Sequence, residues 1–212
     1  LEDLGARAVV LEAGYDGPAL AAAQRLALRI VWLHPDDATA GAFTLSCDAT
    51  AAAAPGAPSS DDVALILHTS GTTSRPKIVP LLQSNLAASA RNIAGSLDLT
   101  ANDRCLSVMP LFHIHGLVAA VSATLSSGGS IFCTPGFNAL NFFAMMSEAQ
   151  PTWYTAVPTM HQAILSRAGR NAEVIQANPL RFLRSSSASL PAQDMGQLAE
   201  TFGAPVVEAY GM

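Results

Sequence analysis

The chain has 212 residues, of which 50% are hydrophobic and 13% charged, and its formal net charge is −5 at pH 7. With a mean hydropathy of +0.31, it is too apolar to be a disordered chain and long enough for one large core or two smaller ones. Acidic and basic residues are dispersed, so no basic face of the kind that binds nucleic acid is evident. The three cysteines, Cys47, Cys105 and Cys133, are too few and too far apart for a disulfide framework or a zinc site, and they favour a reducing compartment.

The first part of the chain alternates between strand and helix patterns. Residues 1–35 predict a helical start, a strand at 6–12, a helix at 17–28 and a strand at 29–33, an order typical of an α/β domain. Residues 36–62 are rich in Ala, Pro, Asp and Ser and predict a long surface connection. The chain begins at Leu1 without the features of a signal peptide and stops on an apolar run, so we expect it to be a piece of a longer protein.

The same alternation continues over the rest of the chain. A strand at 63–69 runs into a glycine-containing loop, and the helical spacing of 81–99 predicts a helix that begins near Gln83 or Ser84. Further strands are predicted at 105–112, 130–134, 152–158, 180–187 and 204–210, with helices at 116–128, 137–150, 158–169 and 190–203. This order predicts a mostly parallel sheet flanked by helices, with right-handed crossovers. We predict a partial first α/β subdomain with its connection at 1–62, and an incomplete central nucleotide-binding subdomain at 63–212.

One long stretch has no charged residue. Between Cys105 and Ser147 there is no Asp, Glu, Lys or Arg, whereas a membrane-spanning helix needs about 20 consecutive apolar residues. Proline and glycine interrupt this stretch repeatedly. Buried strands and a buried helix explain it better, because parallel sheets that are covered on both faces read as continuous apolar runs.

Residues 67–80 read LHTSGTTSRPKIVP, a cluster of small hydroxyl residues between an apolar strand and a lysine. A glycine and several hydroxyl and backbone N–H donors at the end of a strand are typical of a site for phosphate oxygens, and Lys77 would neutralise phosphate charge. The spacing is not that of a Walker A motif. The alternative is an ordinary turn rich in Ser and Thr with a solvated lysine.

Four segments together resemble one family. The stretch SGTTSRPK resembles the phosphate-binding signature of the adenylate-forming superfamily, which contains acyl-CoA synthetases, and it is followed in the family's order by PLFHIHG at 110–116, RSSSASLP at 184–191 and EAYGM at 208–212. The sequences of these segments are most similar to those of the oxalate–CoA ligase branch, although Ser74 and Ile78 stand where glycine is commoner. The resemblance covers the whole chain and implies the large N-terminal α/β domain of such an enzyme.

The resemblance also implies roles for individual residues. The β- and γ-phosphates of ATP would be held by Ser70, Gly71, Thr72, Thr73 and Lys77, with Thr72 touching Mg²⁺. A carboxylate would attack the α-phosphorus to give an acyl-adenylate and pyrophosphate, and CoA would then take the acyl group as a thioester. Fixed donors and a metal would supply most of the stabilisation.

Further residues are assigned to the acid and the adenine. His113 matches a histidine near the carboxylate and the α-phosphate, and His115 would line the acid pocket. The backbone of the loop formed by Ser186, Ser187 and Ala188 would contact adenine. Tyr210 would stack on the adenine, and Glu208 would lie at the edge of the site. The alternatives are a buried structural histidine for His113, a core tyrosine for Tyr210 and a carboxylate facing water for Glu208.

The pocket residues favour a small polar acid. A second negative charge on the substrate is costly to bury without donors or cations, and the candidate segments offer His113, His115, Ser187, Ser189 and, as a further candidate, Arg184. This favours oxalate or another small dicarboxylate, such as malonate, over a fatty acid. Two alternatives stay open: an amino-acid-adenylating domain of a peptide synthetase, and a non-catalytic nucleotide-binding paralogue.

The resemblance sets expectations for the whole protein as well. Beyond Met212 the family has a Mg²⁺-binding glutamate, a ribose-binding aspartate and a C-terminal domain with a catalytic lysine, so we expect the 212-residue chain alone to be inactive. The expected partners are ATP, CoA and a small acid, with no nucleic acid and no membrane span. The expected location is the cytoplasm, or the peroxisome in a eukaryote, and the oligomeric state is left open.

Overall fold

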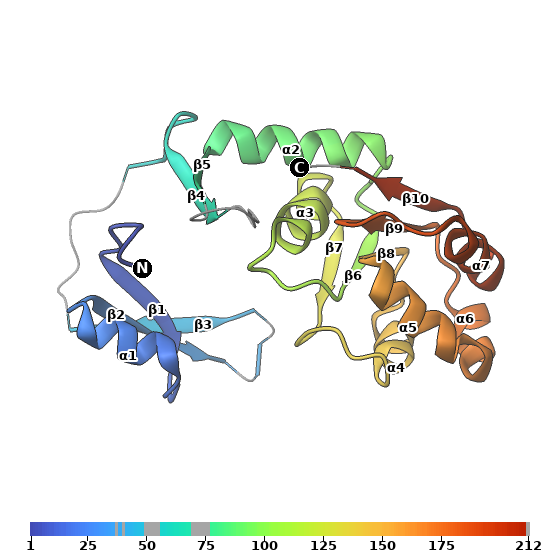
Figure 1. Cartoon of the computed structure of the whole chain (residues 1–212), viewed down its shortest axis with the longest axis horizontal. Helices are drawn as coiled ribbons and strands as arrows, with labels where there is room; N and C mark the ends of the chain where they lie inside the picture. Colours follow the sequence, from blue (N-terminus) through green and yellow to red (C-terminus); the bar gives the residue numbers. More distant parts are fainter. Residues whose placement is uncertain (37, 40, 49–55, 69–76, 211–212) are drawn as a thin grey trace. The chain divides into compact units, whose positions relative to one another are not determined.

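The computed structural model of the chain describes residues 1–36, 38–39, 41–48, 56–68 and 77–210 (Figure 1). The chain divides into two compact units, which are described separately. Unit 1 consists of residues 1–58 and 67–79, and unit 2 of residues 59–66 and 80–212. The predicted division at residue 62 stays a prediction.

Unit 1 contains a three-stranded sheet and one helix. Its elements are β1 (Ala8–Glu12), α1 (Pro18–Arg25), β2 (Arg29–Pro35) and β3 (Phe43–Ser46). Pro18 opens α1, as expected for a residue whose missing N–H costs nothing at the first helical position. β1 and β2 are parallel and joined through α1, whereas β3 pairs with β2 in the antiparallel direction. The predicted β-α-β order is therefore confirmed.

Two sequence-based expectations for this unit are wrong. Residues 2–5 form turns and not a helix, and Gly5 at their end has a left-handed conformation with φ 57°. The connection predicted at 36–62 contains β3, whose four residues are all exposed. An exposed strand of this length lacks the buried apolar face that makes a strand visible in a sequence.

A second short sheet flanks the glycine-containing loop. It consists of β4 (Val63–His68) and β5 (Ile78–Leu82), and the boundary between the two units passes through both strands. β4 was predicted, but β5 was not, because Pro80 within it argues against a strand except at a sheet edge. The helix α2 (Gln83–Ser96) follows directly and begins at the predicted residue.

Unit 2 is built on a five-stranded parallel sheet in the order β10-β9-β8-β6-β7 (Figure 1). Its strands are β6 (Arg104–Ser107), β7 (Ser130–Cys133), β8 (Trp153–Ala156), β9 (Phe182–Ser186) and β10 (Val206–Ala209). Each corresponds to a predicted strand, although the predicted bounds were longer. The expectation of a mainly parallel α/β sheet is confirmed.

Helices connect these strands and cover the sheet. They are α3 (Ala123–Ser126), α4 (Phe142–Ala149), α5 (Pro158–Ala168), α6 (Ala172–Ala177) and α7 (Ala192–Phe202), with a 3₁₀ turn η2 (Gly169–Asn171) before α6. The helix predicted at 116–128 is only partly α-helical, because a π-helix, η1 (His115–Ser122), precedes α3. The short α6 was not predicted. None of the helices in the described residues is long and apolar enough to cross a membrane.

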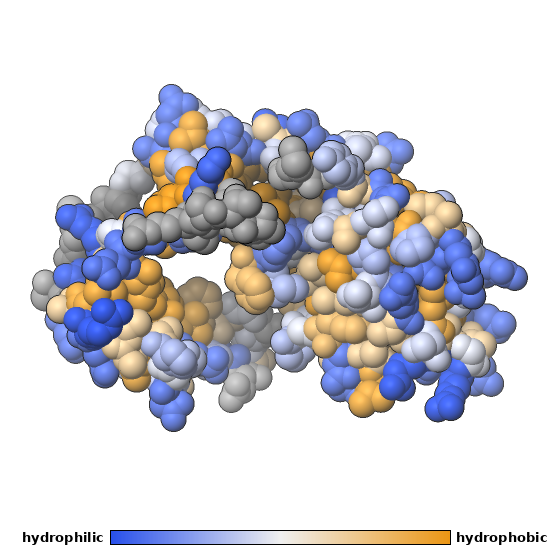
Figure 2. All heavy atoms as spheres, viewed as in Figure 1, coloured by the Kyte–Doolittle hydropathy of each residue, from blue (hydrophilic) through white to orange (hydrophobic). Residues whose placement is uncertain are grey.

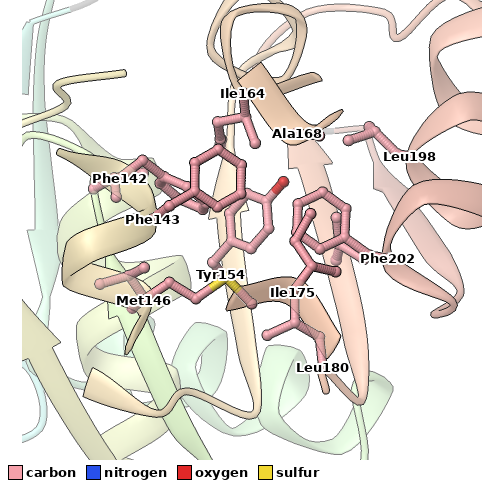
Figure 3. Close-up of a cluster of buried hydrophobic side chains, with 14 of the residues drawn as sticks. Phe142, Phe143, Met146, Tyr154, Ile164, Ala168, Ile175, Leu180, Leu198 and Phe202 are labelled. Carbon is pink, nitrogen blue, oxygen red and sulfur yellow. The ribbon is translucent and has the colours of Figure 1, made fainter. Parts of the chain in front are cut away.

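The main core lies on one face of the unit 2 sheet. Phe142, Phe143 and Met146 of α4 meet Tyr154 of β8, and Ile164 and Phe202 close the cluster from α5 and α7 (Figure 3). The Tyr154 hydroxyl donates to His161 Nδ1 at 3.1 Å, and His161 Nε2 donates to the Arg184 carbonyl oxygen at 3.3 Å. His161 is therefore a buried structural residue, as the sequence indicated. Hydrophilic residues dominate the rim of this unit over α6 and α7 (Figure 2).

The opposite face of the sheet holds a smaller core. Trp153 stacks on Phe182 with ring centroids 5.1 Å apart, and Cys105 and Leu97 pack beside them. Because side chains alternate along a strand, Trp153 and Thr155 share this face, while Tyr154 points to the main core. On β9, Arg184 shares the face of Phe182 by the same rule. This face carries the residues of the candidate site.

Asp103 ties the amino-terminal ends of three strands together. Its carboxylate accepts hydrogen bonds from the Thr100 amide at 2.8 Å, the Thr152 hydroxyl at 2.8 Å and Arg181 Nε at 3.0 Å. Burial opposes ionisation of Asp103, but these three donors outweigh it and hold the pKa of the carboxyl below its ordinary value. The network is structural and lies at the end of the sheet away from the site.

Candidate active site

Three segments meet at the carboxyl ends of the unit 2 strands. β6 continues into residues 108–115, β9 into 187–190, and β10 ends directly before Tyr210. Since β10, β9, β8 and β6 are neighbours and parallel, the residues that follow them lie along one edge of the sheet. In open α/β sheets, this is the edge at which ligands bind.

Gly116 fixes how the π-helix approaches β6. A Cβ atom at this position would overlap the carbonyl oxygen of Pro110 and would lie 3.0 Å from that of Met109. Only glycine therefore allows η1 to begin this close to the end of β6. π-Helical turns within helices are rare and are frequent at functional sites.

The two histidines of the PLFHIHG segment have different surroundings. The backbone N–H of His115 donates to His113 Nδ1 at 3.2 Å, which fixes the ring of His113. The His113 side chain is exposed. His115 is buried, with 3% of its surface exposed.

A hydrogen-bonded chain connects His115 with both β8 and β9. His115 Nε2 lies 2.6 Å from Thr155 Oγ1, Arg184 Nη1 lies 3.3 Å from the same oxygen, and His115 Nδ1 lies 3.0 Å from Ser187 Oγ. Arginine can only donate, so Thr155 Oγ1 accepts from Arg184. The direction of the two hydrogen bonds of His115, to Thr155 and to Ser187, depends on which ring nitrogen carries the proton.

Burial and a nearby cation keep His115 neutral. Burial is the larger cause and the charge of Arg184 the next, and together they lower the pKa of His115 from 6.5 to about 3. Burial also lowers the pKa of the Arg184 guanidinium, although arginine stays protonated in proteins. At neutral pH the hydrogen-bonded group of Arg184, Thr155, His115 and Ser187 therefore carries one positive charge, which is on Arg184.

The loop after β9 is held in an uncommon conformation. Ser187 has φ 74°, in the left-handed region that favours glycine, which costs about 1–3 kcal/mol for other residues. The hydrogen bond to His115 holds its side chain, and the Leu190 amide donates to Glu208 Oε1 at 2.8 Å. These two bonds tie the loop to η1 and to β10.

The other predicted residues have these positions. Ser186 is half-buried, whereas Ala188, Ser189 and Glu208 are exposed, and Tyr210 is 91% exposed. Lys77 directly precedes β5 and is exposed. The predicted phosphate-binding residues Ser70, Gly71, Thr72 and Thr73 lie outside the described residues, as does the end of the EAYGM segment.

Thr155 is the residue of this site that the sequence did not reveal. It joins His115, 40 positions earlier, to Arg184, 29 positions later. Strand alternation places Thr155 on one face of β8, but only the register with β9, in which Thr155 pairs with Arg184, brings the three residues together. No local sequence pattern predicts that strand register.

The family follows from comparison with known proteins. A sequence model described as AMP-binding enzyme matches residues 1–212. The chain belongs to this family of AMP-binding enzymes. The resemblance of the four motifs to adenylate-forming enzymes is thereby confirmed, and so is the fold that it implied.

Several family members are similar over much of the chain. An oxalate–CoA ligase from Arabidopsis thaliana is 50% identical over 154 residues, which are 72% of this chain and 30% of the plant protein. A sulfoacetate–CoA ligase from Cupriavidus necator is 35% identical over 206 residues, which are 97% of this chain and 37% of that enzyme. A solved malonyl-CoA ligase, in a ternary product complex with methylmalonyl-CoA and AMP, has a TM-score of 0.78 and 29% identity over 100% of this chain and 43% of its own. The chain thus spans well under half of these AMP-binding enzymes.

Proposed function

We propose that this chain is the nucleotide- and acid-binding part of an AMP-forming acid–CoA ligase that activates a small acid with a second negative charge. The observation that carries the proposal is the chain of donors at the carboxyl edge of the sheet, from Arg184 through Thr155 and His115 to Ser187. An apolar acyl tunnel would leave the buried charge of Arg184 without a counter-charge from the substrate. Relatives named for oxalate and sulfoacetate support the same class of acid.

The proposed reaction has two steps. A carboxylate oxygen of the acid bonds to the α-phosphorus of ATP, and pyrophosphate leaves; the sulfur of CoA then bonds to the acyl carbon, its proton is lost, and AMP leaves. Negative charge develops on phosphoryl oxygens in the first step, so fixed donors and cations provide the stabilisation.

Each predicted residue keeps its role within this proposal. Lys77 neutralises phosphate charge together with the donors Ser70, Gly71, Thr72 and Thr73, and Mg²⁺ is assigned to Thr72. His113, which is exposed at the site edge, is assigned to the carboxylate and the α-phosphate. The loop of Ser186, Ser187 and Ala188 is assigned to the adenine, which stacks on Tyr210, while Ser189 faces the acid. A location in the cytoplasm, or in the peroxisome of a eukaryote, stays a prediction.

Glu208 bears on the choice between a ligase for dianionic acids and an amino-acid-adenylating domain. The latter needs a carboxylate for the amino group of its substrate, and the Glu208 carboxylate accepts a hydrogen bond from the Leu190 amide. The buried charge beside His115 is a cation, which repels an ammonium group. The cation favours the acid–CoA ligase, whereas Glu208 does not decide the choice, because one hydrogen bond leaves its carboxylate further acceptor sites.

A pyrophosphate-release assay tests this function. The open reading frame that encodes this chain is expressed, and ATP, Mg²⁺ and CoA are supplied with each of a panel of acids: oxalate, malonate, acetate, octanoate and glycine. We expect oxalate or malonate to give the highest kcat/KM. A preference for octanoate would contradict the small-acid proposal, and a preference for glycine would favour an amino-acid-adenylating enzyme.

A further inference from the structure

Arg184 is a buried cation, and no carboxylate in the described residues balances its charge. Its exposed fraction is 7%, and its side-chain hydrogen bond goes to a neutral hydroxyl, that of Thr155. Across the described parts of both units, the one ion pair is between Arg181 and Asp103, so no carboxylate there pairs with Arg184. A buried charge is costly unless it is paired, so this arrangement calls for an anion from outside the chain.

A second arginine on the same segment provides the contrast. Arg181 lies three residues earlier, directly before β9, and its Nε is 3.0 Å from Asp103 Oδ1. Its side chain is 41% exposed, whereas Arg184 is only 7% exposed. The partly exposed Arg181 therefore has a carboxylate partner, whereas the buried Arg184 has none among the described residues.

The position of Arg184 suits a ligand at the site. It is the middle residue of β9, two residues before Ser186 at the carboxyl end of the strand, and Thr155 is its neighbour in the register of the sheet. Its charge is close enough to be the second cause of the lowered pKa of His115. An anion that binds against His115 and Ser187 is therefore within the field of the guanidinium.

Resting on the proposed ligase function, we propose that Arg184 supplies the counter-charge for the second, non-reacting anionic group of the acid. That group binds at the Arg184–Thr155–His115–Ser187 chain, while the reacting carboxylate faces the α-phosphate. Arg184 is thus the residue that makes the enzyme prefer a dianionic acid to a neutral-tailed acid of the same size.

The experiment compares each dianionic acid with its monoamide, which has nearly the same shape but a single charge. Initial rates of pyrophosphate release are measured for oxalate against oxamate, and for malonate against malonamate, in the protein expressed from the full reading frame. For the unmodified enzyme we expect kcat/KM to favour the dianion by at least about tenfold. A smaller preference in both pairs would overturn the proposal without any variant.

The variants then assign the preference to one residue. Arg184→Met removes the charge but keeps an apolar side chain of similar length, and replacing a buried charge in this way is often neutral for folding. Truncating one partner of a buried charge pair costs about 2–5 kcal/mol, so kcat/KM for the dianion should fall by about 30- to 4 × 10³-fold. The monoamide rate should change by far less, and the preference should disappear. Arg184→Lys, which keeps the positive charge, should restore part of it.

Arg170→Met is the matched control, because Arg170 is exposed in η2 and is not part of the site. It removes the same charge and should keep the full preference for the dianion. Equal losses for dianion and monoamide in Arg184→Met, or the same preference in Arg184→Lys and Arg184→Met, would overturn the role of Arg184 while leaving the ligase function intact. Absence of pyrophosphate release with every acid would instead overturn the proposed function, and this inference with it.

Discussion

Replacing Gly116 by alanine tests how the structure positions the two histidines. The new Cβ would overlap the Pro110 carbonyl oxygen and lie 3.0 Å from that of Met109. Both obstacles are backbone atoms, so no flexible side chain can move away, and η1 must shift. Overpacking of this kind costs about 1–3 kcal/mol of the free energy of unfolding.

The shift should affect activity more than stability. His115 begins η1, and its Nε2 lies only 2.6 Å from Thr155 Oγ1. A displacement of about 1 Å would stretch this bond beyond hydrogen-bonding distance, and a misplacement of that size can cost about 10²-fold in rate. We expect acid-dependent pyrophosphate release to fall by about this factor in Gly116→Ala, with a lower midpoint of urea unfolding.

Gly196→Ala is the control for the substitution itself. Gly196 lies within α7, and a Cβ there would meet nothing within 4 Å. Alanine favours the helix there by about 0.5–1 kcal/mol, so this variant should be more stable and fully active. The reasoning is refuted if Gly116→Ala matches the parent in both unfolding midpoint and rate, or gains stability as Gly196→Ala does.

Four further predictions follow from the same structure and resemblance. Lys77→Ala should lower acid-dependent pyrophosphate release by at least about 10²-fold, and an unchanged rate would remove Lys77 from the mechanism. Folding keeps His115 and His161 neutral, because burial lowers their pKa values from 6.5 to about 3 and about 4. The stability that the two neutral histidines provide is complete above pH 6.5. As the pH falls from 6.5 towards 4, the free energy of unfolding should decrease by up to about 1.4 kcal/mol per pH unit for each histidine, because the unfolded state binds protons there. A urea midpoint that is independent of pH in this window would contradict this prediction. Asp103→Ala should lower the free energy of unfolding by about 1–3 kcal/mol, because it leaves buried donors without an acceptor, and an unchanged urea midpoint would show that the network adds nothing. The 212-residue chain alone should form no acyl-CoA, and thioester detected by mass spectrometry would show this to be wrong.

Much of the fold was predictable because the sheet of unit 2 is buried on both faces. Strands such as β8 appear as short apolar runs with proline or glycine at their ends, and Pro158 marks the start of α5. The elements that were missed lack these signals: β3 is exposed and β5 contains Pro80. The π-helix differs from an α-helix in its backbone hydrogen bonds and not in its apolar composition, so the sequence did not distinguish it.

The site was predictable only in part. The motifs identified His115 and Ser187 individually, and the structure joins them by a hydrogen bond. The roles predicted for these residues stay predictions. The part played by Thr155 depends on strand register, and the lack of a carboxylate beside Arg184 in the described residues depends on what surrounds it in three dimensions. Neither property is local in the sequence.

The most direct test of the proposed chemistry is to observe the acyl-adenylate itself. The protein from the full reading frame is mixed with α-labelled ATP, Mg²⁺ and oxalate or malonate in the absence of CoA, and the quenched products are separated. We expect a labelled adenylate of the dianionic acid, which CoA then converts to free AMP and the thioester. Labelled ATP that stays intact with every dianionic acid, but reacts with a neutral-tailed acid, would contradict the account.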